Sequence, residues 1–183
     1  MSTQTSIFDS QTELKQIFQI ITKKIVGETC HQIDFSYGDE LQLDFGEMRA
    51  YSHPKLAHLT KGSWQLSTRA TGWLLKHNNK VLISDIDNYN RVEQEMFPFA
   101  WNFIESKTQV LETAKQLEQK KLNDLVIDDI SMGLTLFFED NYQFIVKPDS
   151  QDDSGLAYWE LIMPNEQVLI VGPKLFWEYK SIH

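Results

Sequence analysis

The feature that most constrains the fold is a pattern that occurs twice in this chain of 183 residues. The stretch from Asp34 to Gly38 and the stretch from Asp129 to Gly133 share the order acid, apolar residue, Ser, bulky residue, Gly. Each is followed by a segment, Leu41 to Phe45 and Leu134 to Phe138, whose alternate positions are Leu, Leu and Phe. A period of two is typical of β-strands. We therefore expect two copies of one strand-rich unit.

A second shared motif extends the repeat. Trp64-Gln65-Leu66 and Trp159-Glu160-Leu161 have the same order of aromatic, polar and apolar residues. The second copy opens the stretch AYWELIMPNEQVLIV, which predicts two strands joined by a turn at Met163 to Glu166. By analogy, GSWQLSTRATGWLL predicts a hairpin with its turn at Arg69 to Gly72. On this alignment Trp64 corresponds to Trp159, and both side chains are expected to pack in the core.

Each strand-rich unit is preceded by a segment with the spacing of a helix. Ser10 to Glu13 matches a capping box, and an apolar stripe with steps of three and four follows it, so the first helix is expected to run from there to Gly27. The second is expected to begin around Pro98 and to end near Leu122.

These elements predict an α+β fold. We expect a tandem duplication of a helix plus an antiparallel β-meander, with the sheets forming a sandwich or half-barrels covered by helices. The first half is expected to span residues 1–88 and the second residues 89–183. Because no Gly/Ser-rich or Pro-rich linker separates the halves, we expect them to pack as one compact unit.

The charge balance restricts the partners of the chain. There are 17 Lys and Arg residues against 26 Asp and Glu residues, so the net charge of -9 opposes binding to nucleic acid and to anionic membranes and favours a basic protein partner. Cys30 is the only cysteine, which excludes an internal disulfide and suits a reducing compartment. No stretch approaches the ~18 apolar residues of a membrane span, and MSTQTSIFDS lacks the basic and apolar segments of a signal peptide. We expect a cytoplasmic protein, and the oligomeric state stays open.

Residues capable of catalysis or metal binding do not form a known motif in the sequence. His53 and His58 do not have the spacing of a helical zinc pair, and Cys30 with His31 would need further ligands from elsewhere. Asp44 alternates with apolar neighbours, so it is expected on a solvated face. The prediction is therefore no catalytic residue, no metal and no cofactor, while the question whether acidic residues or the two histidines form a site stays open.

Candidate partner-binding residues come from the loops and from the aromatic cluster near the C-terminus. The loop at residues 52–62 is rich in His and Lys, whereas the loop at residues 148–155, expected at the same place in the second copy, carries Asp149, Asp152 and Asp153. Divergent loops on a repeated scaffold are typical of functional surfaces. Trp177 and Tyr179 lie in the densest aromatic cluster, so these five residues form the predicted partner-binding set.

The strand motifs resemble a group of small bacterial domains. Gly38 to Phe45 has the pattern Gly-x-x-Leu-x-Leu-x-Phe, and it is followed by Trp64-Gln65-Leu66. Together with Trp159-Glu160-Leu161, this is similar to small uncharacterised bacterial β-rich domains, some of which are suspected of toxin-immunity roles. Gly133-Leu134 departs from the pattern because it lacks two intervening residues. The resemblance covers most of each strand-rich half but not the helices, and it transfers no catalytic residue.

Acidity, the expected cytoplasmic location and the missing catalytic motifs favour a non-enzymatic protein-interaction module, for example an immunity-type inhibitor of a basic partner. The alternatives are a small-ligand-binding protein with a pocket between the halves, and a hydrolase that uses acidic residues or His53 and His58. A pocket with converging polar groups would favour the alternatives, whereas a flat acidic face with exposed aromatic residues would favour the interaction module.

Overall fold

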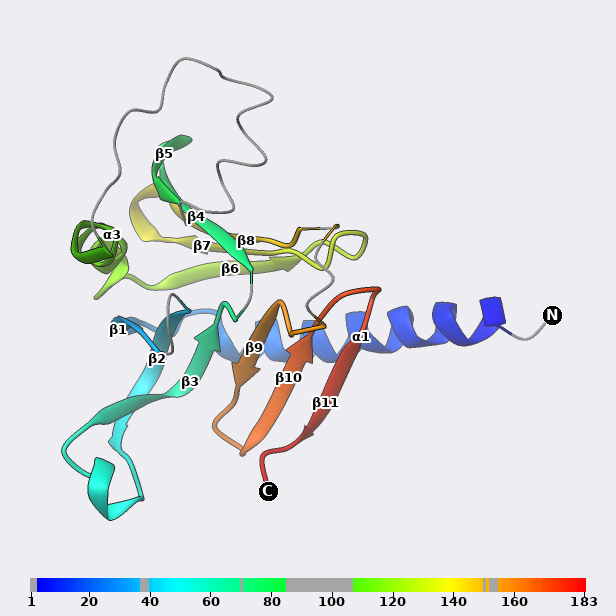
Figure 1. Ribbon diagram of the computed structural model, residues 1–183, viewed down its shortest axis with the longest axis horizontal. Helices are drawn as coiled ribbons and strands as arrows, with labels where there is room; N and C mark the ends of the chain where they lie inside the picture. Colours follow the sequence, from blue (N-terminus) through cyan, green and yellow to red (C-terminus); the bar gives the residue numbers. More distant parts are fainter. Residues whose placement is uncertain (1–2, 37–39, 70, 85–106, 150, 152–154) are drawn as a thin grey trace.

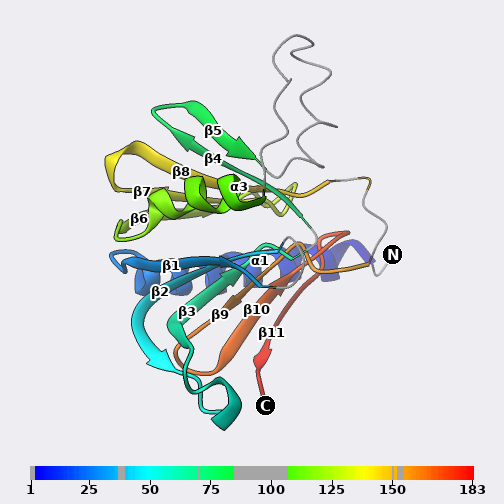
Figure 2. The ribbon, with the colours of Figure 1, turned by 60° about the vertical axis from the view of Figure 1, so that its left-hand side comes forward.

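The fold consists of two antiparallel sheets and few helices (Figure 1), which confirms the α+β class. The structure is a computed structural model that describes residues 3–36, 40–69, 71–84, 107–149, 151 and 155–183. The five-stranded sheet lies against the six-stranded sheet, with α1 beside the larger and α3 beside the smaller (Figure 2).

The larger sheet contains, in spatial order, β1 (Cys30–Phe35), β2 (Leu41–Ala50), β3 (Thr60–Ser67), β9 (Trp159–Ile162), β10 (Gln167–Val171) and β11 (Trp177–Ser181). The smaller sheet contains β5 (Lys80–Ser84), β4 (Gly72–His77), β8 (Tyr142–Lys147), β7 (Leu134–Phe138) and β6 (Leu122–Ile127). The described helices are α1 (Thr3–Ile25), α3 (Lys107–Ala114) and the short 3-10 turns η1 (Pro54–Leu56), η2 (Lys115–Leu117) and η3 (Glu139–Asn141).

Each half of the chain contributes strands to both sheets. β3 pairs with β9, and β8 pairs with β4, so each sheet is joined by one seam between the halves. The predicted hairpin around Arg69 to Gly72 is therefore wrong, because β3 and β4 lie in different sheets. β9 occupies the edge of β3 that a hairpin partner would have taken. The predicted hairpin of β9 and β10, with its turn at residues 163–166, is confirmed.

The two sheets repeat the same strand order and register. The order β1-β2-β3-β9-β10 in one sheet matches β6-β7-β8-β4-β5 in the other, and both first strands carry a bulge at the same step. At the seams, Leu66 of β3 faces Leu161 of β9, and Phe144 of β8 faces Leu75 of β4. Leu43 faces Leu66 as Leu136 faces Phe144, so positions in the two sheets can be matched one by one.

This register changes which tryptophans correspond. Trp159 lies two residues before the Leu of β9 at its seam, and Trp73 lies two residues before the Leu of β4 at the other. Trp73 is therefore the structural counterpart of Trp159, and the predicted correspondence with Trp64 is wrong. The predicted burial of Trp64 and Trp159 is confirmed, since they are 4% and 0% exposed.

Reciprocal backbone bonds lie where the halves meet. Among the described residues, these are Gly27 N to Leu122 O (2.8 Å), Gln119 N to Cys30 O (2.7 Å), Leu122 N to Glu28 O (2.9 Å) and Cys30 N to Lys120 O (2.9 Å). Each bond in one direction has a counterpart in the other, as around a two-fold axis. Gly27 and Gln119 both have positive φ (94° and 68°), the conformation that turns each chain from its helix into its first strand.

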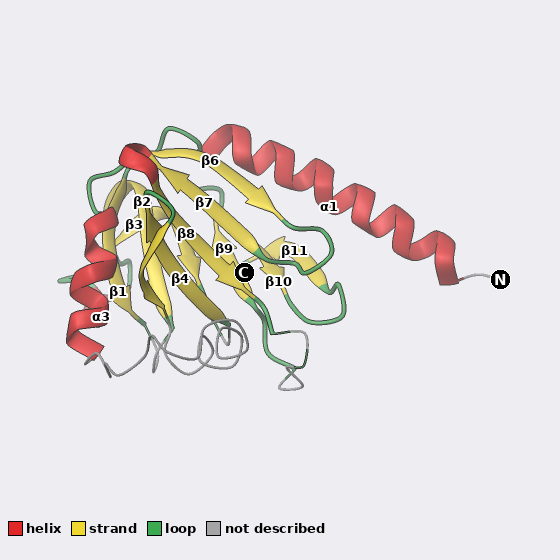
Figure 3. Cartoon of the chain, turned by 90° about the horizontal axis from the view of Figure 1, so that it is seen from above, coloured by secondary structure: helices red, strands yellow, loops and turns green. Residues whose placement is uncertain are grey.

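The core lies between the sheets and under the helices. Phe45 of β2 stacks on Phe138 of β7, with ring centroids 6.0 Å apart, so these two strands face each other across the core. Phe18 of α1 packs edge-on against Trp159, whose Nε1 donates to Met132 O at 2.9 Å. Figure 3 shows α1 and α3 at different sides of the stacked strands. α1 therefore covers the part of the larger sheet's apolar face that the smaller sheet does not reach, and α3 does the same for the smaller sheet.

The helix boundaries differ from those expected. α1 begins at Thr3 rather than near Ser10, because residues 3–9 contain no Gly or Pro that would stop the helix. The second helical segment ends with η2 at Leu117, and Leu122 is already the first residue of β6. The reciprocal bonds at the junction require the chain to leave the helix by Gln119. The expected start near Pro98 lies outside the described residues.

Cys30 is buried at the first residue of β1, and burial raises the pKa of its thiol far above the ordinary range, with a smaller contribution from Glu118.

Among the described helices, none combines the length and the apolar composition that crossing a bilayer requires.

The matched tryptophans provide a test of the packing. Trp159 Nε1 donates to Met132 O, whereas Trp73 Nε1 is buried without a hydrogen-bond partner among the described residues. We expect Trp159→Phe to lower the free energy of unfolding by about 1 kcal/mol more than Trp73→Phe, because only the former breaks a hydrogen bond. Urea unfolding of both variants measures this difference, and equal losses would contradict the proposed role of the bond.

Candidate functional site

The described residues form a hollow on the outer face of the smaller sheet, at the seam between β4 and β8. Its volume is about 350 Å³. The residues on this face that line it are Gly72, Leu74, Gly133, Thr135, Ile145 and Lys147. Because β4 belongs to the first half and β7 and β8 to the second, both halves contribute to the hollow.

Two glycines leave room for the hollow. Gly72 lies opposite Lys147 at the start of β4, and Gly133 directly precedes β7. A Cβ atom at Gly133 would lie 3.0 Å from Val146 O and 3.1 Å from Ser131 Oγ, so a side chain there requires its neighbours to shift. The floor consists of Leu74, Thr135 and Ile145 on adjacent strands. An apolar floor with a few polar groups is typical of ligand sites.

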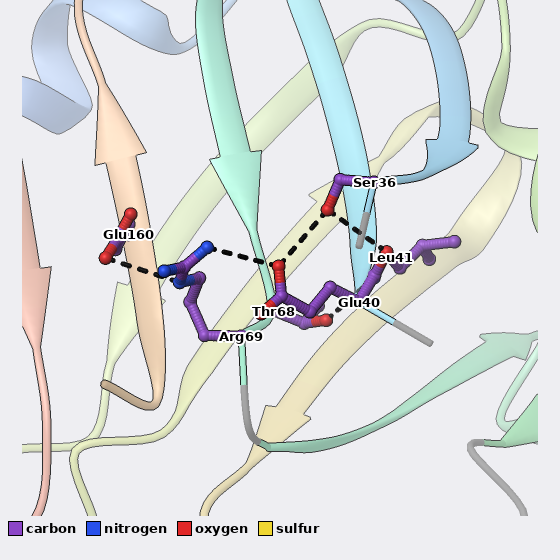
Figure 4. Close-up of polar contacts among 6 residues, drawn as sticks. All are labelled: Ser36, Glu40, Leu41, Thr68, Arg69 and Glu160. Atoms are coloured by element: carbon purple, nitrogen blue, oxygen red, sulfur yellow. Dashed lines mark hydrogen bonds and ion pairs between the residues drawn. The ribbon is translucent and has the colours of Figure 1, made fainter. Parts of the chain in front are cut away.

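The equivalent place on the larger sheet is filled by an ion-pair cluster. Arg69, just after β3, lies between Glu40 and Glu160 (Figure 4). Its Nη1 is 3.1 Å from Glu40 Oε2, and its Nε is 3.3 Å from Glu160 Oε1. Ser36 Oγ also donates to Glu40 Oε2, at 3.2 Å. The pair with Glu160 crosses the seam between the halves.

The hollow arises from differences between matched positions of the two sheets. The turn bond from Ser36 N to Glu40 O (2.9 Å) has its counterpart in the bond from Asp128 N to Gly133 O (2.9 Å). This bond and the seam registers identify the matched positions. Glu40 corresponds to Gly133, Arg69 to Lys147, Glu160 to Leu74, and Tyr158 to Gly72. The smaller sheet thus keeps the cation but has neither carboxylate, and Lys147 makes no ion pair with any described residue.

Polar groups lie around the rim of the hollow. Asp128 and Ser131 belong to the β6–β7 turn, and Asp149 follows β8. Asp128 Oδ1 accepts from Ser131 N at 3.0 Å and from Ile130 N at 2.9 Å, and these bonds hold the pKa of the Asp128 carboxyl below its ordinary value. Asp149 Oδ1 accepts from Gln151 N at 2.9 Å. The rim therefore carries two carboxylates, those of Asp128 and Asp149.

The structure separates the predicted partner-binding residues. Asp149 lies on the rim of the hollow, whereas Trp177 and Tyr179 lie on β11, at the edge of the larger sheet. Trp177 is half-buried, and Tyr179 is 40% exposed. Asp152 and Asp153 lie outside the described residues. The five residues thus do not form one described surface.

The two loops that were compared in the sequence are not equivalent. The first, containing η1, connects β2 to β3, and its counterpart in the second half is the short η3 turn at Glu139–Asn141. The loop with Asp149 connects β8 to β9 and has its counterpart at the crossing between β3 and β4. The misplaced hairpin caused this error. His53 and His58 are both exposed, His53 Nδ1 accepts from Lys55 N, and the described residues contain no cluster suited to a metal ion.

Asp44 was expected on a solvated face, but it is 2% exposed. Its Oδ1 accepts from Gly62 N and from Gln65 Nε2, both at 2.9 Å, and its Oδ2 accepts from Gln42 Nε2 at 3.1 Å. The pairing of β2 with β3 shifts register beside it, which leaves Gly62 N to this side chain. Asp44 therefore stabilises a β-bulge, and period-two patterning does not reveal such a role.

Gly72, Gly133 and Lys147 carry no pattern in the sequence that predicts a site. Gly133 stood out only as part of the repeated motif, and Gly72 only as a turn residue. The signal that identifies them is the difference between matched positions, Gly133 against Glu40 and Gly72 against Tyr158. That difference becomes visible only with the correct strand alignment.

Comparisons with protein-family models, with curated proteins and with solved structures found no match to this chain. The class that the fold and the site define is a two-sheet α+β protein with a ligand-sized hollow on one sheet. The chemistry of that hollow is the basis for its functional interpretation.

The Asp128 turn predicts a pH dependence of stability. Since its folded-state pKa is lowered, the stabilisation is present above the ordinary pKa of an Asp carboxyl and is lost as the pH falls through the folded-state value. We expect Asp128→Ala to reduce the free energy of unfolding by about 0.5–1 kcal/mol at neutral pH, a modest value because the carboxyl is exposed. Urea unfolding at neutral and at acidic pH should show this difference shrinking in acid.

Asp128→Asn is the control, since it keeps an acceptor oxygen that does not titrate. Its stability relative to Asp128→Ala should stay constant across the same pH range. If the wild type and Asp128→Asn lose stability in parallel as the pH falls, Asp128 does not contribute to the acid sensitivity.

Proposed function

We propose that this protein binds a small organic carboxylate with an apolar body in the hollow at the β4–β8 seam. The observation that carries the proposal is the matched position on the larger sheet, where Glu40 and Glu160 supply two carboxylates to Arg69. Lys147 has neither counterpart, so a ligand carboxylate would take their place beside the ammonium. The hollow is at the small end of the size range of ligand sites, about 300–1,000 Å³.

The rest of the lining suits the remainder of such a ligand. Ile145, beside the buried Leu74, offers an apolar surface on which a short aliphatic chain would lose contact with water. Asp128 and Asp149 add negative charge at the rim, which favours a second, cationic group on the ligand. An α-amino acid with an aliphatic side chain meets all of these conditions.

The proposal predicts selective binding within a matched set of probes. The set is 4-methylpentanoate, leucine and isoamylamine, which share a branched apolar body and carry a carboxylate, both groups or an amine. We expect 4-methylpentanoate and leucine to shift the backbone amide signals of Gly72, Thr135 and Lys147 saturably in protein-observed NMR titrations, with leucine at least as tight. Isoamylamine should bind more weakly than either, because it lacks the carboxylate that would pair with the Lys147 ammonium.

Variants locate the binding. Lys147→Gln should weaken both carboxylate probes about tenfold, as expected for the loss of one charge-assisted hydrogen bond. Lys80→Gln, which removes an exposed lysine from the opposite end of β4 and β5, is the matched control and should change nothing. If no carboxylate probe gives saturable shifts at the hollow, or if both variants behave alike, the ligand proposal fails.

We also propose that the two-sheet fold arose by tandem duplication of a unit corresponding to residues 1–88 and 89–183. The shared strand order, the matched registers and the reciprocal bonds at residues 27–30 and 119–122 support this origin. In the duplicated chain, β4 and β5 joined the sheet of the second copy and β9 and β10 that of the first.

A second candidate function is the recognition of a basic protein in the cytoplasm, such as the target of an immunity-type inhibitor. Two observations favour it: the net charge of -9, and the exposure of Phe176 (51%) and Tyr179 (40%) at one edge of the larger sheet. Acidic surfaces accelerate the association with basic partners, and exposed aromatic side chains supply contact area.

The acidic loop tests this second candidate. We expect Asp149→Asn, Asp152→Asn and Asp153→Asn together to slow the association with a basic partner recovered from the source cell and to weaken its salt dependence. Stopped-flow association at low and high salt measures both effects, with thermal unfolding as the check on the fold. An unchanged association rate at low salt would contradict a role for this loop.

A further inference from the structure

β11 is an edge strand of the larger sheet. β11 pairs with β10 on one side, and no described strand lies on the other (Figure 1). Ile182 N donates to Glu166 O at 3.0 Å and Gly172 N donates to Phe176 O at 2.9 Å, so the even-numbered residues direct their backbone groups towards β10. By the alternation of an antiparallel ladder, Tyr179 and Ser181 direct theirs outwards. An edge of this kind is a template for another strand.

We propose that this edge is the interface of a homodimer in which β11 pairs antiparallel with β11 of a second copy, centred on Tyr179. This proposal is independent of the ligand site. A two-fold axis at Tyr179 makes its outward N–H and C=O donate to and accept from Tyr179 of the partner subunit. The two six-stranded sheets then become one continuous sheet.

The charges along β11 are complementary under this symmetry. Glu178 and Lys180 flank Tyr179 on the outer face of the sheet, and they contact each other with Lys180 Nζ 2.8 Å from Glu178 Oε2. Their side chains are 43% and 49% exposed, so both can re-pair. In the dimer, Glu178 lies opposite Lys180 of the partner subunit, and Lys180 lies opposite Glu178 of the partner subunit. Opposite charges facing across two strands stabilise the pairing.

The inner face beside β11 carries the apolar surface that the dimer would cover. An open groove of about 210 Å³ lies between α1 and this edge, and Ile20, Trp64, Met163 and Tyr179 contribute to it. Ile20 is 56% exposed and Tyr179 is 40% exposed. Because the axis is perpendicular to the sheet, both copies place α1, Ile20 and Tyr179 on the same side of the continuous sheet. A second copy therefore satisfies the backbone, the charges and the apolar face together.

Charge reversal provides the experiment. Sedimentation velocity of the full chain should show a species of twice the 21.4 kDa chain mass as the concentration rises, with a dissociation constant in about the micromolar to millimolar range. Glu178→Lys and Lys180→Glu should each place like charges opposite one another and shift the dimer midpoint to at least about tenfold higher concentration. Circular dichroism checks that both exposed substitutions leave the fold intact.

Mixing the two variants is the decisive step. A chain with Lys at both positions faces a chain with Glu at both positions, so the equimolar mixture should form a heterodimer at concentrations where each variant alone is monomeric. Lys174→Glu, at an exposed position outside β11, is the control and should dimerise like the wild type. A wild type that stays monomeric throughout overturns the proposal. So does a dimer that is insensitive to both substitutions, or a mixture that stays monomeric.

Discussion

The structure depends on the two seams at which strands of one half complete the sheet of the other. At these seams β9 adds to the edge of β3, and β4 adds to the edge of β8. Without the exchange, each half would leave the backbone groups of a middle strand without partners, which is costly for buried strands. The reciprocal bonds between residues 27–30 and 119–122 hold the halves in the orientation that lets both seams form. The facing pair Phe45 and Phe138 then fills the space between the sheets.

The inner and outer faces of the two sheets differ in how far they follow the repeat. On the inner faces, Leu, Leu and Phe occupy the same places on β2 and β7, and Trp73 and Trp159 occupy the same place at the seams. Core positions are restricted by packing, so similar side chains are expected there. On the outer faces, matched positions carry different chemistry, a filled ion-pair cluster in one sheet and a hollow in the other. The outer faces are therefore where the two sheets differ in chemistry.

The sequence was sufficient to predict the fold class, because the alternation from Leu41 to Phe45 and from Leu134 to Phe138 identifies strands and their buried faces. It was not sufficient to predict which strands pair. Alternation specifies the face of each side chain but not its neighbour, and Arg69 to Gly72 has the residues of a turn although the chain changes sheet there. Because the hairpin was predicted wrongly, Trp64 instead of Trp73 was aligned with Trp159. The same mistake aligned the loop at residues 52–62 with the loop at residues 148–155. It also hid the glycines of the hollow, because their meaning depends on the side chains at the matched positions.

The difference between the two seams connects the site with the stability of the fold. On the larger sheet, the pair of Arg69 with Glu160 links the two halves directly. Partly exposed pairs of this kind contribute less than about 1 kcal/mol. On the smaller sheet, Lys147 has Leu74 at the matched position across the seam, so the described residues form no such link there. A ligand that binds there only in the folded state would contribute about 2.7 kcal/mol at a concentration of 100 times its dissociation constant. Occupancy of the hollow would thus stabilise the folded state by more than the Arg69–Glu160 pair does on the larger sheet, so folding and binding would be coupled.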